Sequence, residues 1–111
     1  MIGKGTYFNS GQIHAGYSSK IIIGENCAIG YNVHIKSRTH DINCPTGENM
    51  TMIEKDIVIG NNVWIGDNVF IKEGVNIGDN IIIGANSVLT KDIPNNVIVA
   101  GYPAKVINKN I

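Results

Sequence analysis

An aliphatic residue recurs at every sixth position over most of this sequence. The column consists of Ile23, Ile29, Ile35, Ile59, Ile65, Ile71, Ile77, Ile83 and Leu89. Glycine follows it directly at six of these nine places, and asparagine or glycine lies three residues after it at seven. Because Asn and Gly adopt a left-handed backbone at the lowest cost, this second column predicts a corner every six residues. A unit this short cannot bury its own aliphatic side chain, so successive units must coil and stack.

Three such units per turn make a triangular prism with stacked aliphatic side chains inside it, in rungs about 4.8 Å apart that pair as parallel strands. The spacing predicts three stacked pairs: Ile59 with Ile77, Ile65 with Ile83, and Ile71 with Leu89. The content of 21 Ile and 9 Val against 1 Leu favours strands over helices. We therefore expect an all-β fold, a parallel β-helix, as one domain over residues 1–111.

Two segments break the period. Over residues 37–56 the aliphatic column fails, and turn-forming residues such as Pro45 and Gly47 appear. A loop that projects from one corner explains this break, and such loops usually carry function. Over residues 8–21 we expect only an irregular coil around the glycines. The repeat already fits the first residues, so we expect another subunit or a further segment to cover that end of the prism.

The charge balance excludes several classes of partner. Nine basic and nine acidic side chains leave no net field to recruit nucleic acid or an anionic membrane. No apolar run approaches the roughly 18 residues that span a bilayer, and residues 1–9 lack the layout of a signal peptide. Cys27 and Cys44 are expected to be free thiols, as in a reducing compartment. We expect a soluble, cytoplasmic protein.

Three stretches resemble the hexapeptide-repeat acyltransferases, most closely the maltose, galactoside and polysaccharide O-acetyltransferases. These stretches are residues 32–35 leading into 39–41, residues 61–66, and residues 90–94 followed by 100–107. The resemblance implies that the prism is left-handed and that the protein is a homotrimer with active sites between subunits. It also implies transfer of acetyl from acetyl-CoA to a hydroxyl of a sugar or polysaccharide acceptor.

A sugar hydroxyl is a weak nucleophile, so acetyl transfer needs a base within hydrogen-bond reach, and histidine suits this at neutral pH. His40 stands at the start of the predicted loop, where the family places its catalytic histidine, so the resemblance makes it the general base of a ternary complex. His34 is expected at the outer edge of a strand, and His14 lies in the segment without a register. Asp41 follows His40 where the family commonly has proline; it either orients the imidazole or is simply solvated.

Trp64 precedes an inward Ile, so its ring should lie outside the prism, where it either forms a wall of the catalytic site or covers its neighbours. Asp67 is grouped with the coenzyme A site, although the family more often has a small residue there; a carboxylate would narrow the thioester site or contact the acceptor. Other residues that match the family's coenzyme A site are Gly84, Ala85, Thr90, Lys91 and Lys105. We expect acetyl-CoA as the acyl donor and no metal.

Three alternatives remain open. Histidine would serve equally as a base for an amino sugar, which makes N-acetyl transfer the runner-up. A non-catalytic trimeric scaffold would need the aliphatic column but not the loop histidine. The γ-type carbonic anhydrases share the prism and bind zinc through three histidines, but His34 and His40 are six residues apart where that family's close pair is five apart.

Overall fold

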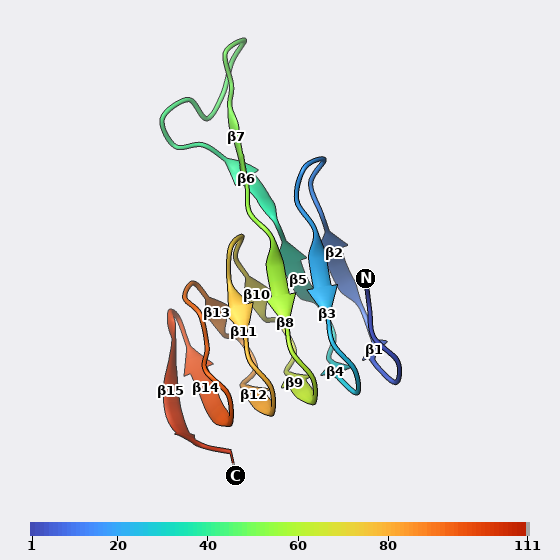
Figure 1. The fold of residues 1–111 in the computed structure, drawn as a ribbon. Coiled ribbons are helices and arrows are strands. Elements are labelled where there is room, and N and C mark those ends of the chain that lie inside the picture. Colours follow the sequence, from blue (N-terminus) through green and yellow to red (C-terminus); the bar gives the residue numbers. More distant parts are fainter. Residues whose placement is uncertain (111) are drawn as a thin grey trace.

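The computed structural model describes residues 1–110 and shows a three-sided left-handed β-helix with one projecting arm (Figure 1). The six-stranded face contains, in spatial order, β1 (Tyr7–Phe8), β4 (Ala28–Ile29), β9 (Val63–Ile65), β12 (Ile81–Ile83), β14 (Val97–Gly101) and β15 (Ala104–Lys109). The four-stranded face contains β13 (Val88–Leu89), β10 (Phe70–Ile71), β5 (Val33–Lys36) and β2 (Gly11–His14). The three-stranded face contains β11 (Asn76–Ile77), β8 (Ile57–Ile59) and β3 (Ile21–Ile23). Residues 1–110 contain no helix, and so none that is long and apolar enough to cross a membrane.

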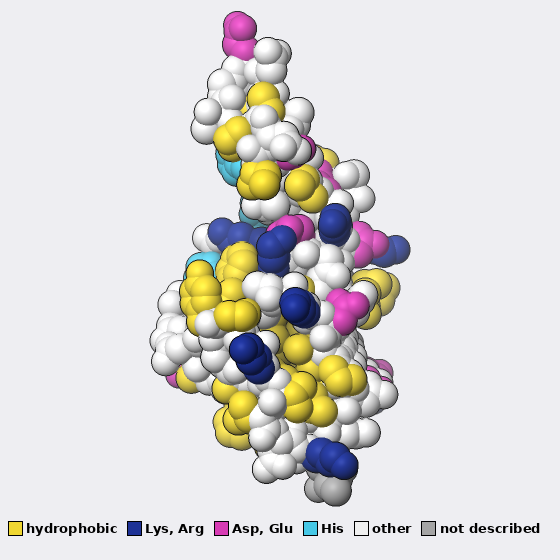
Figure 2. Space-filling model, turned by 90° about the vertical axis from the view of Figure 1, so that its left-hand side faces the viewer, with side chains coloured by type: hydrophobic (Ala, Val, Ile, Leu, Met, Phe, Trp, Pro, Cys, Tyr) yellow, Lys and Arg dark blue, Asp and Glu magenta, His cyan; other side chains and the backbone are white. Residues whose placement is uncertain are grey.

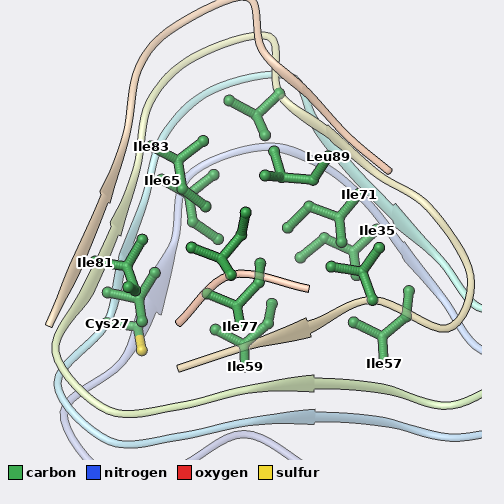
Figure 3. Packing of buried hydrophobic residues seen from close by; sticks show 14 of the residues in the cluster. Cys27, Ile35, Ile57, Ile59, Ile65, Ile71, Ile77, Ile81, Ile83 and Leu89 are labelled. Atoms are coloured by element: carbon green, nitrogen blue, oxygen red, sulfur yellow. The ribbon is translucent and has the colours of Figure 1, made fainter. Parts of the chain in front are cut away.

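Stacked aliphatic side chains fill the interior of the prism (Figure 3). The strand pairings place Ile59 on Ile77, Ile65 on Ile83 and Ile71 on Leu89, which confirms the predicted stacking. None of these six side chains is more than 3% exposed. Burial of apolar surface contributes about 25 cal/mol per Å², so each coil is held mainly by the aliphatic side chains of the coils on either side of it.

The asparagine column forms the corners, as predicted. Seven asparagines have φ between 55° and 62°: Asn26, Asn32, Asn62, Asn68, Asn80, Asn86 and Asn96. Along one edge, Asn32 Nδ2 donates to Asn68 Oδ1 at 2.7 Å, and Asn68 Nδ2 donates to Asn86 Oδ1 at 3.2 Å. These ladders link the corners of successive coils by side-chain hydrogen bonds, in addition to the backbone pairing of the strands.

The prediction of an irregular coil over residues 8–21 is wrong in part. β2 lies within this segment and pairs in parallel with β5, so that Ile13 stands opposite Ile35. The corner before β2 is one residue shorter than the repeat, because Phe8 and Ile13 are five positions apart while their partners Ile29 and Ile35 are six apart. Residues 15–20 form a wide corner between β2 and β3. These two changes of spacing hide β2 from a count of six.

The arm, residues 38–54, leaves the prism at the corner between the four-stranded and three-stranded faces (Figure 1). Its stem is an antiparallel pair of strands, β6 (Arg38–His40) and β7 (Met52–Glu54), with His40 opposite Met52. The coils on the two sides of the arm remain in register, because Ile35 pairs directly with Ile71. The arm is therefore an insertion between two stacked coils.

At the C-terminal end of the stack of coils, β15 turns back and runs antiparallel to β14. This return supplies hydrogen-bond partners to the outer edge of β14, which would otherwise be an open strand edge. Lys105 thereby comes to lie opposite Ala100 on the six-stranded face.

Candidate active site

His40 ends strand β6 in the stem of the arm, and its imidazole is exposed. Nδ1 of the ring lies 2.7 Å from the carbonyl oxygen of Pro45. Because a carbonyl only accepts hydrogen bonds, Nδ1 carries the proton and donates it, which leaves a lone pair on Nε2 of the neutral ring. The arm thus holds His40 in the tautomer that a general base needs.

The turn that brings Pro45 back to His40 is closed by Asp41. Oδ1 of Asp41 accepts the backbone N–H of Asn43 at 2.9 Å, and its carbonyl oxygen accepts the backbone N–H of Cys44 at 3.1 Å. The carboxylate of Asp41 therefore shapes the turn, and the direct partner of the imidazole is the carbonyl of Pro45.

Glu54 fastens the stem of the arm to the wide corner that precedes β3. Its Oε1 accepts the backbone N–H of Ser18 at 2.9 Å and the hydroxyl of Ser19 at 2.8 Å. The hydrogen bond from the Ser18 backbone, followed by that from the Ser19 hydroxyl, lowers the pKa of Glu54. Its Oε2 lies 3.7 Å from Nε of Arg38, and the Arg38 guanidinium lies over the ring of Tyr17, 5.1 Å from its centre.

Sequence reasoning did not single out this polar cluster. The hydroxyl of Ser37 is fully buried, lies 2.7 Å from that of Ser19, and accepts the backbone N–H of Gly16 at 3.1 Å. A side chain at Gly16 would meet the Glu54 carboxylate, which would have to move away from its partners Ser18 and Ser19. These residues lie where the repeat is interrupted, so no periodic signal marks them.

We expect Glu54→Gln to weaken the attachment of the stem to the wide corner, and to remove the pH dependence of Ser18 amide protection. Since the pKa of Glu54 is lowered in the folded protein, its carboxylate stabilises the fold fully above the ordinary value of 4.5. This contribution is lost as the pH falls through the lower pKa of the folded state. The protection factor of the Ser18 amide against hydrogen exchange should therefore fall in acid in the parent. In Glu54→Gln it should be low throughout, because neutral hydrogen bonds are about half as strong.

Glu48→Gln is the matched control, because Glu48 is an exposed carboxylate elsewhere in the arm. It should reproduce the parent's profile of Ser18 protection against pH. Identical profiles for Glu54→Gln and the parent would contradict the assigned role of Glu54.

His40 lines an open pocket of about 440 Å³ between the arm and the four-stranded face. This volume lies within the range of about 300–1,000 Å³ that ligand pockets occupy. The prism contributes His14, Lys36, Phe70 and Glu73, and the arm contributes Arg38, Thr39, His40 and Met52. Figure 2 shows Lys, Arg and His side chains, with Asp and Glu side chains among them, around the neck between the arm and the prism. We call this cavity the arm pocket.

A second pocket, of about 320 Å³, lies on the six-stranded face. Four of the predicted site residues line it: Trp64, Asp67, Gly84 and Ala85. Trp64 is 58% exposed on the outside of β9, as its place before the inward Ile65 predicts. We call this cavity the tryptophan pocket.

Asp67 has a structural partner that the sequence did not reveal. Its Oδ1 accepts the backbone N–H of Tyr31 in the preceding coil at 2.8 Å. Asp79 accepts the backbone N–H of Asn61 at another corner in the same way, at 2.7 Å. The carboxylate of Asp67 therefore links two coils as well as lining the tryptophan pocket.

The remaining predicted residues lie further from the tryptophan pocket. Lys105 lies on the same face in β15, which is separated by β14 from β12, the strand that precedes Gly84. Thr90 and Lys91 follow β13, at the corner between the four-stranded and three-stranded faces, and both are exposed. One chain thus gathers four of the predicted residues in one pocket and places His40 in another.

The three histidines do not gather at one point. His34 points outward from β5, with Nε2 3.0 Å from Oδ1 of Asn32. His14 lies opposite Lys36 on the neighbouring strand and lines the arm pocket with His40. Within residues 1–110, no group of three or more His, Cys, Asp or Glu side chains has an arrangement that could hold a metal ion.

Two family models match this chain. The bacterial transferase hexapeptide model, described as six repeats, matches residues 56–91. The model for the hexapeptide repeat of succinyl-transferase matches residues 20–35. Both matches fall on coils of the prism rather than on the arm.

Known proteins with similar sequences and structures agree with these models. Galactoside O-acetyltransferase of Escherichia coli (strain K12) is 47% identical over 89 residues, which are 80% of this chain and 44% of that protein. A hexapeptide-repeat acetyltransferase of Vibrio cholerae superposes with a TM-score of 0.89 at 32% identity, covering 99% of this chain and 62% of that one. A galactoside acetyltransferase solved in complex with coenzyme A gives a TM-score of 0.76 at 45% identity, covering 86% of this chain and 46% of that one.

This chain spans between 44% and 62% of the length of these three relatives. The aligned part contains the aliphatic columns, the asparagine corners and the parallel coils described above. On this agreement of repeat, fold and sequence, the coils over residues 20–35 and 56–91 belong to the hexapeptide-repeat transferase family.

Proposed function

We propose that this protein transfers acetyl from acetyl-CoA to a hydroxyl of a saccharide, with His40 as the general base. The observation that carries the proposal is the hydrogen bond from Nδ1 of His40 to the carbonyl of Pro45, which leaves Nε2 free to accept a proton beside a pocket of ligand size. The identity to a galactoside O-acetyltransferase supports the acceptor class, and the related complex with coenzyme A supports the donor.

In the proposed mechanism, Nε2 of His40 removes the proton of the acceptor hydroxyl while its oxygen attacks the thioester carbonyl carbon. The negative charge that develops on the carbonyl oxygen requires a hydrogen-bond donor. When the carbon–sulfur bond breaks, the His40 imidazolium returns the proton to the leaving thiolate. The acceptor gains an ester, coenzyme A leaves as the free thiol, and His40 returns to its neutral form.

We propose that the complete site forms between copies of the chain in a homotrimer. The arm pocket lies beside the four-stranded face, while the tryptophan pocket lies on the six-stranded face. Each face also carries an exposed large apolar side chain: Val58, Trp64 and Phe70. Cyclic packing of three prisms would cover such side chains and set the arm of one copy against the six-stranded face of the next.

The donor would lie along the six-stranded face of one copy. Gly84 and Ala85 leave room for the pantetheine arm, which approaches backbone most closely at small residues. Asp67 and Trp64 would flank the thioester in the tryptophan pocket. The ammonium of Lys105 on the same face would bind a phosphate of coenzyme A. Thr90 and Lys91 lie at the corner opposite this face, so they would reach the coenzyme A phosphates from the neighbouring copy.

We expect light scattering to report a homotrimer. Three chains of 12.0 kDa amount to about 36 kDa. A stable particle of about 12 kDa at working concentration would contradict the shared site, because the arm pocket and the tryptophan pocket would then never meet.

Thiol release from acetyl-CoA, measured with a panel of sugars, amino sugars and oligosaccharides, tests the function. We expect release that depends on a hydroxyl acceptor and a product whose acetyl group is removed by mild alkali, as an ester is. If the product is instead an alkali-stable amide that forms only on amino sugars, the reaction is N-acetyl transfer rather than O-acetyl transfer. Failure of every acceptor in the panel, with no binding of acetyl-CoA, would overturn the proposal.

A further inference from the structure

The arm pocket contains more positive charge than its acidic residues compensate. Lys36 and Arg38 both line it, separated in the chain by the buried Ser37 at the point where the arm leaves the prism. Lys36 points outward from the end of β5 and stands opposite His14 on β2. These groups share one cavity with His40.

The one carboxylate that lines the arm pocket is already paired. Glu73 forms an ion pair with Lys72, and only 7% of the Glu73 side chain is exposed. Arg38 has the Glu54 carboxylate 3.7 Å from its Nε, yet this Nε has no hydrogen-bond partner among residues 1–110. Lys36 forms no ion pair with any residue in the same range. The ammonium of Lys36 is therefore the uncompensated charge in the pocket that His40 lines.

The position of this charge matters for the acceptor. A general base works only on a hydroxyl within about 2.6–3.2 Å, so the acceptor must occupy the cavity that His40 lines. A neutral saccharide would leave the Lys36 ammonium without a counter-ion in this cavity. An anionic group on the acceptor would pair with Lys36.

We propose that the acceptor is an acidic saccharide and that Lys36 binds its anionic group, a carboxylate or a phosphate. This inference rests on the proposed acetyl transfer and adds the chemical class of its acceptor. Arg38 also lines the arm pocket, where it provides a second donor for the same group, while its own ion pair with Glu54 keeps it in place.

Matched acceptor pairs test the charge alone. One pair is a methyl uronide and its carboxamide, which have the same hydroxyls and differ in the charge at C6. The other is galactose 1-phosphate and methyl galactoside, which both keep the C6 hydroxyl. We expect kcat/KM to be about tenfold higher or more for the charged member of at least one pair. Preference in the first pair identifies a carboxylate, and preference in the second alone identifies a phosphate.

Lys36→Met should lower kcat/KM for the charged acceptor to the level of its neutral partner and change the neutral acceptor by less than about twofold. The control is Lys4→Met, which removes the same charge from an exposed lysine outside the arm pocket. It should keep the parent's preference, and so distinguish local binding from the effect of net charge.

The outcomes separate this inference from the proposed function. Equal turnover of the charged and neutral members would overturn the inference and leave acetyl transfer by His40 standing. A charge preference that survives in Lys36→Met would overturn the role of Lys36. If Lys36→Met raises KM for acetyl-CoA and leaves the acceptor preference unchanged, Lys36 binds the donor, and its proposed role in acceptor binding is overturned as well. Absence of turnover with all four acceptors and with the wider panel would overturn both proposals.

Discussion

His40→Ala is expected to reduce acetyl transfer by about 10²–10⁴-fold, the usual contribution of a positioned general base. The variant removes Nε2, which the Pro45 hydrogen bond leaves unprotonated, and leaves the hydroxyl of the acceptor without a proton acceptor. The loss should appear mainly in kcat, because the proton moves in the transition state rather than on binding. Thiol release from acetyl-CoA with a reactive acceptor measures it.

His34→Ala is the matched control, since His34 lies on the same side of the prism but its Nε2 faces Oδ1 of Asn32. It should retain most of the activity. Both variants should melt close to the parent temperature, because both imidazoles lie outside the aliphatic core. Thiol release by His40→Ala at the parent rate would remove this histidine from the mechanism.

Ile65→Asp is expected to prevent folding. Ile65 is 0% exposed and lies between Ile29 and Ile83 in neighbouring coils. An unpaired carboxylate there costs several kcal/mol or more, and the stacked methyl groups are lost in addition. Since domains of this size are stable by about 5–15 kcal/mol, the prism should not survive. Circular dichroism should show loss of the β spectrum, and most of the protein should be insoluble.

The same chemical change at Ile42 should be tolerated. Ile42 lies in the arm and is 88% exposed, so Ile42→Asp removes no core contact. A soluble, folded Ile65→Asp protein with a melting temperature near that of Ile42→Asp would contradict the assigned register of the aliphatic column.

The repeat itself was predictable from the sequence because every coil gives its residues the same surroundings. A column such as Ile59 and Ile77 needs the same side-chain size in each rung, so the count of six identifies the stacked partners directly. The corners were predictable for a similar reason, since a φ near 60° at Asn26 and its six equivalents restricts the choice of residue. Where every coil places the same requirement on a position, the same residue type recurs along the sequence.

Features that occur once left no such pattern. Strand β2 escapes the count of six because the corners before and after it change the spacing, and the sequence predicts the stem of the arm only as a loop. The hydrogen bond that the backbone N–H of Tyr31 donates to Asp67 joins residues 36 positions apart, across the insertion. The contents of the arm pocket depend on the direction in which the stem of the arm leaves the four-stranded face, which no local sequence rule specifies.

The uninterrupted pairing of Ile35 with Ile71 means that acceptor choice and folding are separable properties in this molecule. Lengthening a surface excursion costs only about 0.6 kcal/mol for each doubling. Descendants of this chain would therefore be free to exchange the segment that carries His40 and Arg38 for another of different length. Under the proposed function, natural variation in acceptor specificity should concentrate in that segment and at Lys36, the last residue of β5, while the inward residues of the rungs change little.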